Sequence, residues 1–187
     1  MEYEYIKKLY YDSIYNLKNI EENIQMVLLS CVGFFLPFVL GHPQILVGVI
    51  VNAMLIVGAT YLKGHKMLPL ILLPSLGVLT AGVIFGTYTI FLLYLIPFIW
   101  IGNTIYIYVY KHVSFKKNSL KNNLLGIGTA SILKAGFLFG ITFLLVQLAI
   151  IPSVFLTAMG VLQLVTALIG GIAAVGIVKA REKILST

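Results

Sequence analysis

Acidic residues are scarce in this sequence. Only 10% of the 187 residues are charged and six are acidic, all near the two ends of the chain: Glu2, Glu4, Asp12, Glu21, Glu22 and Glu182. Carriers driven by protons or sodium commonly keep a carboxylate inside the bilayer, where it binds the coupling ion. The long apolar part of this chain contains none, which argues against a self-powered carrier.

Groups for metal or nucleophilic chemistry are also missing. The single cysteine, Cys31, excludes an intrachain disulfide and any iron–sulfur or four-cysteine metal site built by this chain alone. The histidines lie in loops on opposite sides of the apolar segments, His42 on one and His65 and His112 on the other. No glycine-rich phosphate loop is present. We therefore expect no enzymatic activity, metal or cofactor, and an intramembrane enzyme is the least favoured alternative.

Apolar residues dominate what remains. They make up 60% of the chain, and the mean hydropathy is +1.02, too apolar for a soluble domain. At about 20 residues for each crossing, the apolar part from 24 to 178 supplies six spans. We predict an all-α integral membrane bundle with transmembrane helices at 24–41, 44–62, 68–86, 89–110, 123–150 and 153–178.

Basic residues predict the orientation. The first, third and fifth predicted loops lack Lys and Arg. The alternate loops and both ends are basic, so all basic residues except Lys134 fall on one side. The positive-inside rule makes that side cytoplasmic. We expect a multi-pass protein of the cell membrane with both termini inside, and residues 179–187 forming a cytoplasmic tail.

Residues 1–23 precede the first predicted span. Apolar residues recur there at three- and four-residue spacing from Tyr3 to Ile20, with charges elsewhere around the helix. This pattern predicts an amphipathic helix lying on the cytoplasmic membrane surface. A helix packed on the protein's own loops fits the pattern equally well.

Small residues recur four apart within the predicted spans. The pairs are Gly82 with Gly86 and Gly136 with Gly140, and a longer series runs Thr166, Gly170, Ala174. Such spacing lets helix backbones approach closely in lipid. We expect most of these residues to pack this protein's own bundle, although one such face could dock a partner.

Lys134 is the only formal charge inside a predicted span. An ammonium there costs about 2.5–3.5 kcal/mol on insertion scales, and no carboxylate in the spans can neutralise it. Three explanations for a lysine at this position remain open. The side chain snorkels to the cytoplasmic interface, is held by carbonyls or amides of neighbouring helices, or faces a wet cavity and meets an anionic ligand.

Uncharged polar side chains also occur within the spans. Each unmet polar group is costly in hydrocarbon, so we expect these side chains to face the bundle interior. For any single one, bonding between helices is the favoured explanation, and together they could line a ligand pocket. We expect Gln44 and Gln147 near the outer face, Asn52 and Gln163 deeper, and Asn103 and Lys134 closer to the inner face. The full set is Gln44, Asn52, Ser75, Asn103, Thr142, Gln147 and Gln163.

Several segments together resemble a known family. They are "GHPQILVGVIVNAML", "LPSLGVLTAGVIFG", "IPFIWIGN", the lysine early in the fifth span and "MGVLQLVTALIGG". In these the chain resembles the substrate-binding S component of energy-coupling factor (ECF) vitamin transporters, in an uncharacterised branch. The similarity covers most of the chain from Ile24 onward. One departure is the first helix, where the family's alanine-x-x-x-alanine docking surface is replaced by Ser30, Cys31 and Gly33.

The resemblance implies a function. S components are six-helix proteins that capture a vitamin or similar micronutrient from outside and deliver it by toppling in the membrane, docked to a transmembrane coupling subunit and two ATPases. It implies a small-molecule substrate, anionic or amide-bearing, and no nucleic acid. The alternative is a structural or assembly subunit without a substrate. The implied substrate-binding residues are Gln44, Asn52, Asn103, Lys134, Gln147 and Gln163.

Overall fold

The computed structural model describes residue 11 and the ranges 13–114 and 119–185. Within them the chain is helical, with no strand, and six helical segments are long and apolar enough to cross a membrane. The all-α class and the six crossings are thus confirmed. In chain order the elements are α2 (Asn19–Leu40), α3 (Gln44–Tyr61), η1 (Gly64–Met67), α4 (Leu68–Ala81), η2 (Gly86–Phe91), α5 (Leu92–Ser114), α6 (Leu120–Gln147), α7 (Val154–Met159) and α8 (Val161–Leu185).

Several predicted boundaries are corrected. Helix α2 begins at Asn19 rather than at 24, and α6 ends at Gln147 rather than at 150. Helix α4 ends at Ala81 because Gly82 adopts a left-handed conformation (φ +68°), which favours glycine and terminates helices. The last crossing is interrupted at Gly160, which separates α7 from α8.

The predicted amphipathic helix over residues 1–23 is not confirmed. Residues 1–10 and 12 lie outside the described residues. Residues 13–18 are not helical, so no continuous helix runs up to residue 23. The backbone amide of Tyr15 instead donates to the carbonyl of Thr60 at 3.1 Å, which fixes this segment against the end of α3.

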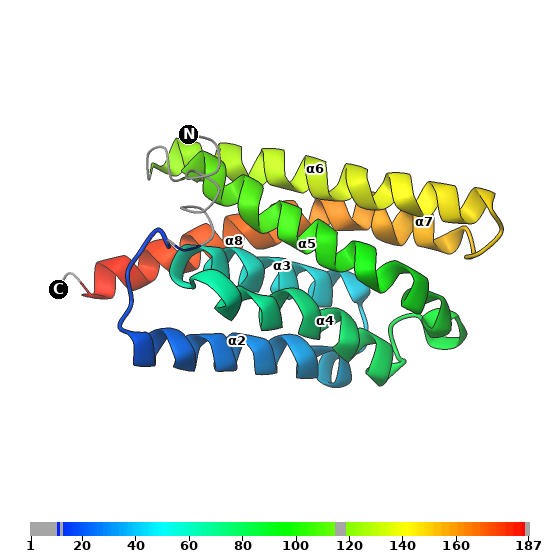
Figure 1. Cartoon of the computed structure of the whole chain (residues 1–187), viewed down its shortest axis with the longest axis horizontal. Helices are drawn as coiled ribbons and strands as arrows, with labels where there is room; N and C mark the ends of the chain where they lie inside the picture. Colours follow the sequence, from blue (N-terminus) through cyan, green and yellow to red (C-terminus); the bar gives the residue numbers. More distant parts are fainter. Residues whose placement is uncertain (1–10, 12, 115–118, 186–187) are drawn as a thin grey trace.

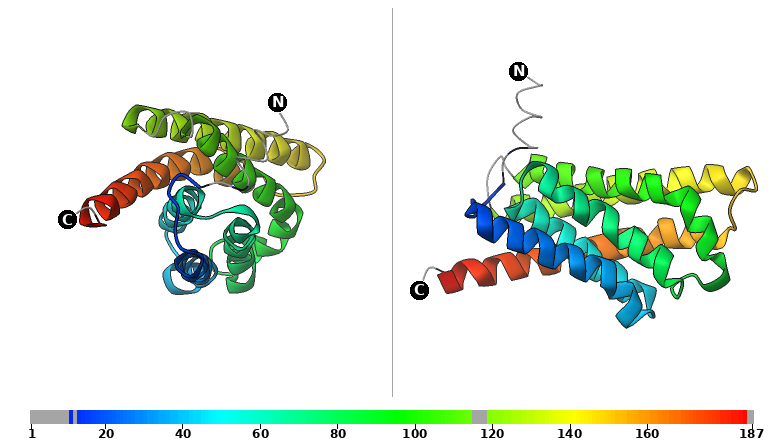
Figure 2. Two further views of the ribbon diagram at one scale, coloured as in Figure 1. Left: turned by 60° about the vertical axis from the view of Figure 1, so that its left-hand side comes forward. Right: turned by 60° about the horizontal axis from the view of Figure 1, so that its bottom comes forward.

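The helices lie lengthwise beside one another (Figures 1 and 2). Helix α5 packs along α6, α3 along α8, and α2 along α4. The connections from α2 to α3, from α4 to α5 and from α6 to α7 lie together at one end of the bundle, on the right in Figure 1. These three are the lysine-free loops of the sequence. They form the apolar-loop end, and the opposite end is the basic end.

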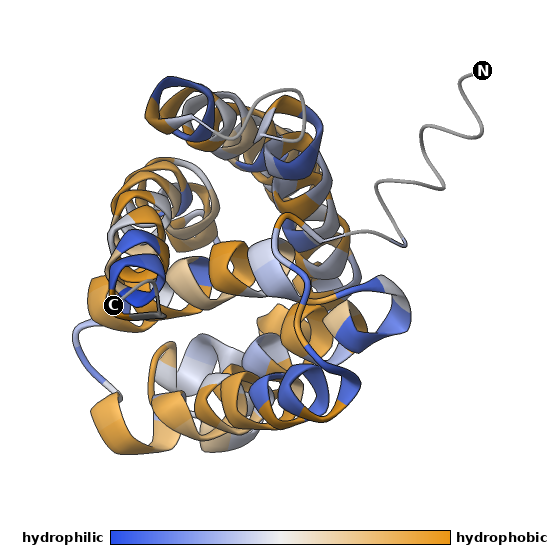
Figure 3. Ribbon diagram, turned by 90° about the vertical axis from the view of Figure 1, so that its left-hand side faces the viewer, coloured by the Kyte–Doolittle hydropathy of each residue, from blue (hydrophilic) through white to orange (hydrophobic). Residues whose placement is uncertain are grey.

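Polar contacts hold the basic end together. Figure 3 looks at this end and shows hydrophilic residues on several of its helices. Glu22 is buried, accepts from the backbone amide of Lys63 at 2.7 Å and pairs with Lys66 at 2.8 Å. Arg181 lies over the ring of Tyr61, 4.5 Å from its centroid. The start of α2 and the end of α8 are therefore both fixed to the segment around the end of α3.

The glycine predictions have mixed outcomes. Gly170 packs tightly, because a Cβ there would lie 2.4 Å from the carbonyl oxygen of Val49 on α3. Gly82 and Gly86 instead adopt positive φ at the turn after α4, and a Cβ on Gly136 or Gly140 would meet nothing within 4 Å. The four-residue spacing therefore indicates close helix contact only in the series on α8.

Candidate functional site

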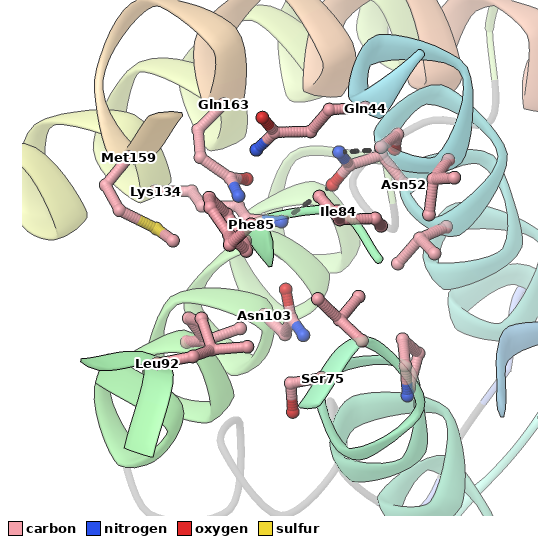
Figure 4. A pocket seen from close by; sticks show the side chains of 16 residues that line it. Gln44, Asn52, Ser75, Ile84, Phe85, Leu92, Asn103, Lys134, Met159 and Gln163 are labelled. Atoms are coloured by element: carbon pink, nitrogen blue, oxygen red, sulfur yellow. Dashed lines mark hydrogen bonds between the residues drawn. The ribbon is translucent and has the colours of Figure 1, made fainter. Parts of the chain in front are cut away.

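A cavity of about 100 Å³ opens among the helices toward the apolar-loop end. Every helix from α3 to α8 contributes to its wall, as does the turn between α4 and η2, and Figure 4 shows the side chains converging on one space. The lining residues are Gln44, Val47, Gly48, Val51, Asn52, Pro74, Ser75, Val78, Ile84, Phe85, Leu92, Ile99, Asn103, Lys134, Met159 and Gln163.

Lys134 supplies the only formal charge among the lining residues. Its residue is 2% exposed, and its Nζ donates to Oδ1 of Asn52 at 2.7 Å. The same Nζ lies 5.2 Å from the ring centroid of Tyr106, within reach of a favourable cation–π contact. The snorkelling explanation is therefore wrong. Lys134 is held by an amide of a neighbouring helix and also lines the cavity.

Asn52 is fixed by three hydrogen bonds. Its Oδ1 accepts from Lys134, and its Nδ2 donates to the carbonyl of Gly48 at 2.9 Å and to Oγ1 of Thr166 at 3.2 Å. The Thr166 hydroxyl in turn donates to the carbonyl of Leu162 at 2.7 Å. Because these bonds leave Asn52 little freedom to rotate, its oxygen is preoriented toward the ammonium.

Close backbone contact between α3 and α8 makes this bonding possible. A Cβ at Gly170 would lie 2.9 Å from the Cβ of Asn52, and one at Gly48 would lie 2.9 Å from Cγ2 of Thr166. Only glycine allows so short a separation of the two helices. The short separation brings the Thr166 hydroxyl within bonding distance of the Asn52 amide.

The wall formed by α4 and α5 is also polar. Asn103 is buried and donates through Nδ2 to the carbonyl of Ile71 at 3.1 Å. Its oxygen points to the side of the cavity where Lys134 lies (Figure 4). The indole of Trp100 donates to Ser75 at 2.8 Å, and Ser75 donates to the carbonyl of Leu72 at 2.9 Å. Asn103 thus keeps an acceptor facing the cavity.

Two glutamine amides complete the polar lining. Gln44 begins α3 and Gln163 lies in the first turn of α8, and both side chains reach into the cavity (Figure 4). Oε1 of Gln163 is buried and accepts no hydrogen bond from any residue that the structure describes. A buried acceptor without a donor is costly, so this oxygen marks a position for a water or a ligand group.

Apolar side chains close the cavity toward the apolar-loop end. Ile84 and Phe85 come from the turn between α4 and η2, and Met159 comes from the end of α7. The ring of Phe85 lies against that of Phe155, with centroids 5.0 Å apart. The cavity therefore combines polar lining groups with apolar side chains that cover it, a combination common in small-molecule sites.

Five of the six residues predicted for the site line this one cavity: Gln44, Asn52, Asn103, Lys134 and Gln163. The sixth, Gln147, is exposed at the end of α6 and lies outside it. The expected separation in depth between Asn52 and Lys134 is wrong, since the two side chains share a hydrogen bond. Each lies near the middle of its helix.

The sequence prediction missed Tyr106 and Thr166. Both follow a predicted residue by one helical turn, Tyr106 after Asn103 and Thr166 after Gln163. Residues three apart share a helix face, so this spacing was a usable signal.

Across the described ranges, no group of three or more His, Cys, Asp or Glu residues could hold a metal ion. The fold and the site define a multi-pass membrane protein with a small polar cavity inside its helical bundle. Comparisons with protein-family models, curated proteins and solved structures give no match for this chain. The resemblance to ECF S components therefore stays a prediction.

Proposed function

We propose that this chain is the substrate-binding membrane subunit of an ECF-type importer for a vitamin-like or other small micronutrient. The observation that carries the proposal is the buried Lys134 ammonium, bonded to Asn52 and lining a cavity that contains no carboxylate. A charge in a membrane helix is costly and usually functional. Binding of an anionic solute to this ammonium would explain why the chain retains a charge that is costly to bury.

The position of the cavity agrees with uptake from outside. It lies toward the apolar-loop end, whereas the start of α2, the connection from α3 to α4 and the end of α8 are at the other end. By the positive-inside rule the basic end faces the cytoplasm, so the apolar side chains that close the cavity, Phe85 among them, face outward. A solute entering there would reach Lys134 near the middle of the bundle.

The energy for transport would come from partners. The sequence has no phosphate-binding loop, and none of its six acids lies at a position that could couple ions through the bilayer. A coupling subunit and ATPases would supply it. Helix α2 lacks the family's alanine pair, and of the three small residues there Ser30 and Gly33 are buried while Cys31 is exposed.

Native mass spectrometry of gently purified protein tests this function. We expect the wild type to retain a small solute, and Lys134→Met to lose it while still inserting into the membrane. Lys121→Met is the matched control, because Lys121 lies on the same helix but is exposed at its first turn. A stoichiometric protein partner without any retained solute would instead favour a structural or assembly subunit.

A further inference from the structure

Charge is the first constraint on what the cavity binds. No acidic side chain is among the lining residues, and Lys134 carries the only formal charge. An ammonium has three N–H donors, and the structure assigns one of them to Asn52. Donors therefore remain for an acceptor in the cavity, and a negatively charged acceptor would gain most in these buried surroundings. A cationic solute would be repelled.

Hydrogen bonding is the second constraint. Oε1 of Gln163 is buried and has no donor among the described residues. Asn52 cannot assist, because its Nδ2 already donates to Gly48 and Thr166. A simple anion would satisfy Lys134 but leave the Gln163 oxygen unmet. A solute that carries its own N–H or O–H group would satisfy both.

Size is the third constraint. An engineered apolar cavity of about 150 Å³ accepts benzene, which has six non-hydrogen atoms. The cavity here measures about 100 Å³, so in this conformation it accommodates a solute of about that size or slightly smaller. The nearby apolar walls at Leu92 and Met159 leave little room for a second charged group.

We propose that the cavity selects a small monocarboxylate that carries a hydrogen-bond donor, with the carboxylate on Lys134 and the donor on the Gln163 oxygen. This inference rests on the proposed function and narrows its substrate class. It predicts discrimination both against anions that lack a donor and against neutral molecules that have one.

Three isosteric probes separate these properties: oxamate, pyruvate and oxamide. Oxamate has a carboxylate and an amide, pyruvate replaces the NH₂ of oxamate by CH₃, and oxamide replaces the carboxylate by a second amide. Binding would be measured by isothermal titration calorimetry on the purified full chain in lipid nanodiscs, in a buffer free of carboxylates. We expect oxamate to bind about tenfold more tightly than pyruvate, the usual effect of one unmet buried polar group. It should also bind about tenfold more tightly than oxamide, which lacks the charge-assisted bond to Lys134.

Two variants test whether Gln163 causes the preference for oxamate over pyruvate. Gln163→Leu removes the unmet acceptor, so it should abolish the preference for oxamate over pyruvate while retaining anion binding. Gln147→Leu is the matched control, because Gln147 is exposed and outside the cavity, and it should keep the preference. If Gln163→Leu does not fold, the order of affinities in the wild type still decides the question.

The outcomes also distinguish this inference from the proposed function. Equal affinity for pyruvate and oxamate, or for oxamide and oxamate, overturns the substrate class. Absence of binding by all three probes overturns it as well. In each case the solute retained by the wild type and lost in Lys134→Met decides the importer proposal separately.

Discussion

Removing either partner of the Lys134–Asn52 hydrogen bond should have very different consequences. In Asn52→Leu the ammonium keeps its charge but loses its amide partner, in a residue that is only 2% exposed. Leaving a buried charged group without its hydrogen-bond partner costs about 3 kcal/mol or more. We expect the free energy of unfolding to fall by that amount.

Lys134→Met should be much milder. It leaves the Asn52 oxygen without a donor, which costs about 1–3 kcal/mol. It also removes a buried ammonium whose insertion costs about 2.5–3.5 kcal/mol. Because these contributions nearly cancel, we expect a change in unfolding free energy of less than about 1 kcal/mol. In the double variant the loss caused by Asn52→Leu should shrink by at least about 2 kcal/mol.

Equilibrium unfolding in bicelles, with a detergent denaturant, measures all four proteins of the cycle. Asn103→Leu is the matched control, because this amide also lies near the middle of its helix but donates to the carbonyl of Ile71 rather than meeting the ammonium. The loss of unfolding free energy caused by Asn103→Leu should be the same in the wild type and in Lys134→Met. Equal and additive losses for Asn52→Leu and Lys134→Met would refute the reasoning, because they would mean that the ammonium does not depend on this amide.

Three further predictions concern packing and orientation. Gly170→Ala should lower the unfolding free energy by about 1–3 kcal/mol through overpacking against α3, whereas Gly140→Ala, which meets nothing within 4 Å, should cause no loss. Glu22→Gln should cost about 1–2 kcal/mol by the same assay, because it removes a partly buried charge-assisted bond. In a background without the native cysteine, a membrane-impermeant maleimide should label His42→Cys on intact cells but Lys121→Cys only after permeabilisation; the reverse pattern would invert the topology.

The architecture was largely predictable because hydrocarbon imposes strong constraints. Apolar length was sufficient to predict six helices, and loop charge was sufficient to predict which connections lie at each end of the bundle. The boundaries were less accurate, because hydropathy does not register backbone conformation. The apolar run continues past Ala81, but the left-handed Gly82 ends the helix there. Similarly, Gly160 interrupts an apolar segment that hydropathy reads as one span.

The membership of the site was predictable, whereas its geometry was not. Polar side chains in an apolar segment are expected to turn inward, and five of the six predicted residues share the cavity. Gln147 lies outside because it ends its helix, where its amide is exposed at the bundle end and needs no internal partner. Hydropathy alone does not distinguish Gln147 from Gln44, which begins α3 and yet lines the cavity.

The predicted depth of Lys134 was wrong for a geometric reason. Lys134 is residue 12 of the predicted span 123–150, but α6 runs three residues earlier, from Leu120 to Gln147, so Lys134 is residue 15 of 28 and lies at the middle of the helix. At 1.5 Å per residue such a helix is about 42 Å long, well over the roughly 30 Å of a hydrocarbon core. A helix that projects beyond the core carries its middle to the midplane. Lys134 in α6 and Asn52 in α3 both lie near the middle of their helices, and they therefore meet.

The absence of an internal acid bears directly on the proposed binding. Had the bundle supplied a carboxylate beside Lys134, the ion pair would have lowered the cost of burying the ammonium. It would also have repelled an anionic solute from the cavity. Asn52 is the alternative that the chain uses: its amide oxygen accepts one N–H bond and leaves the positive charge in place. A neutral partner thus stabilises the ammonium without neutralising it, whereas an acid at position 52 would also stabilise the ammonium but would cancel the charge that an anionic solute needs.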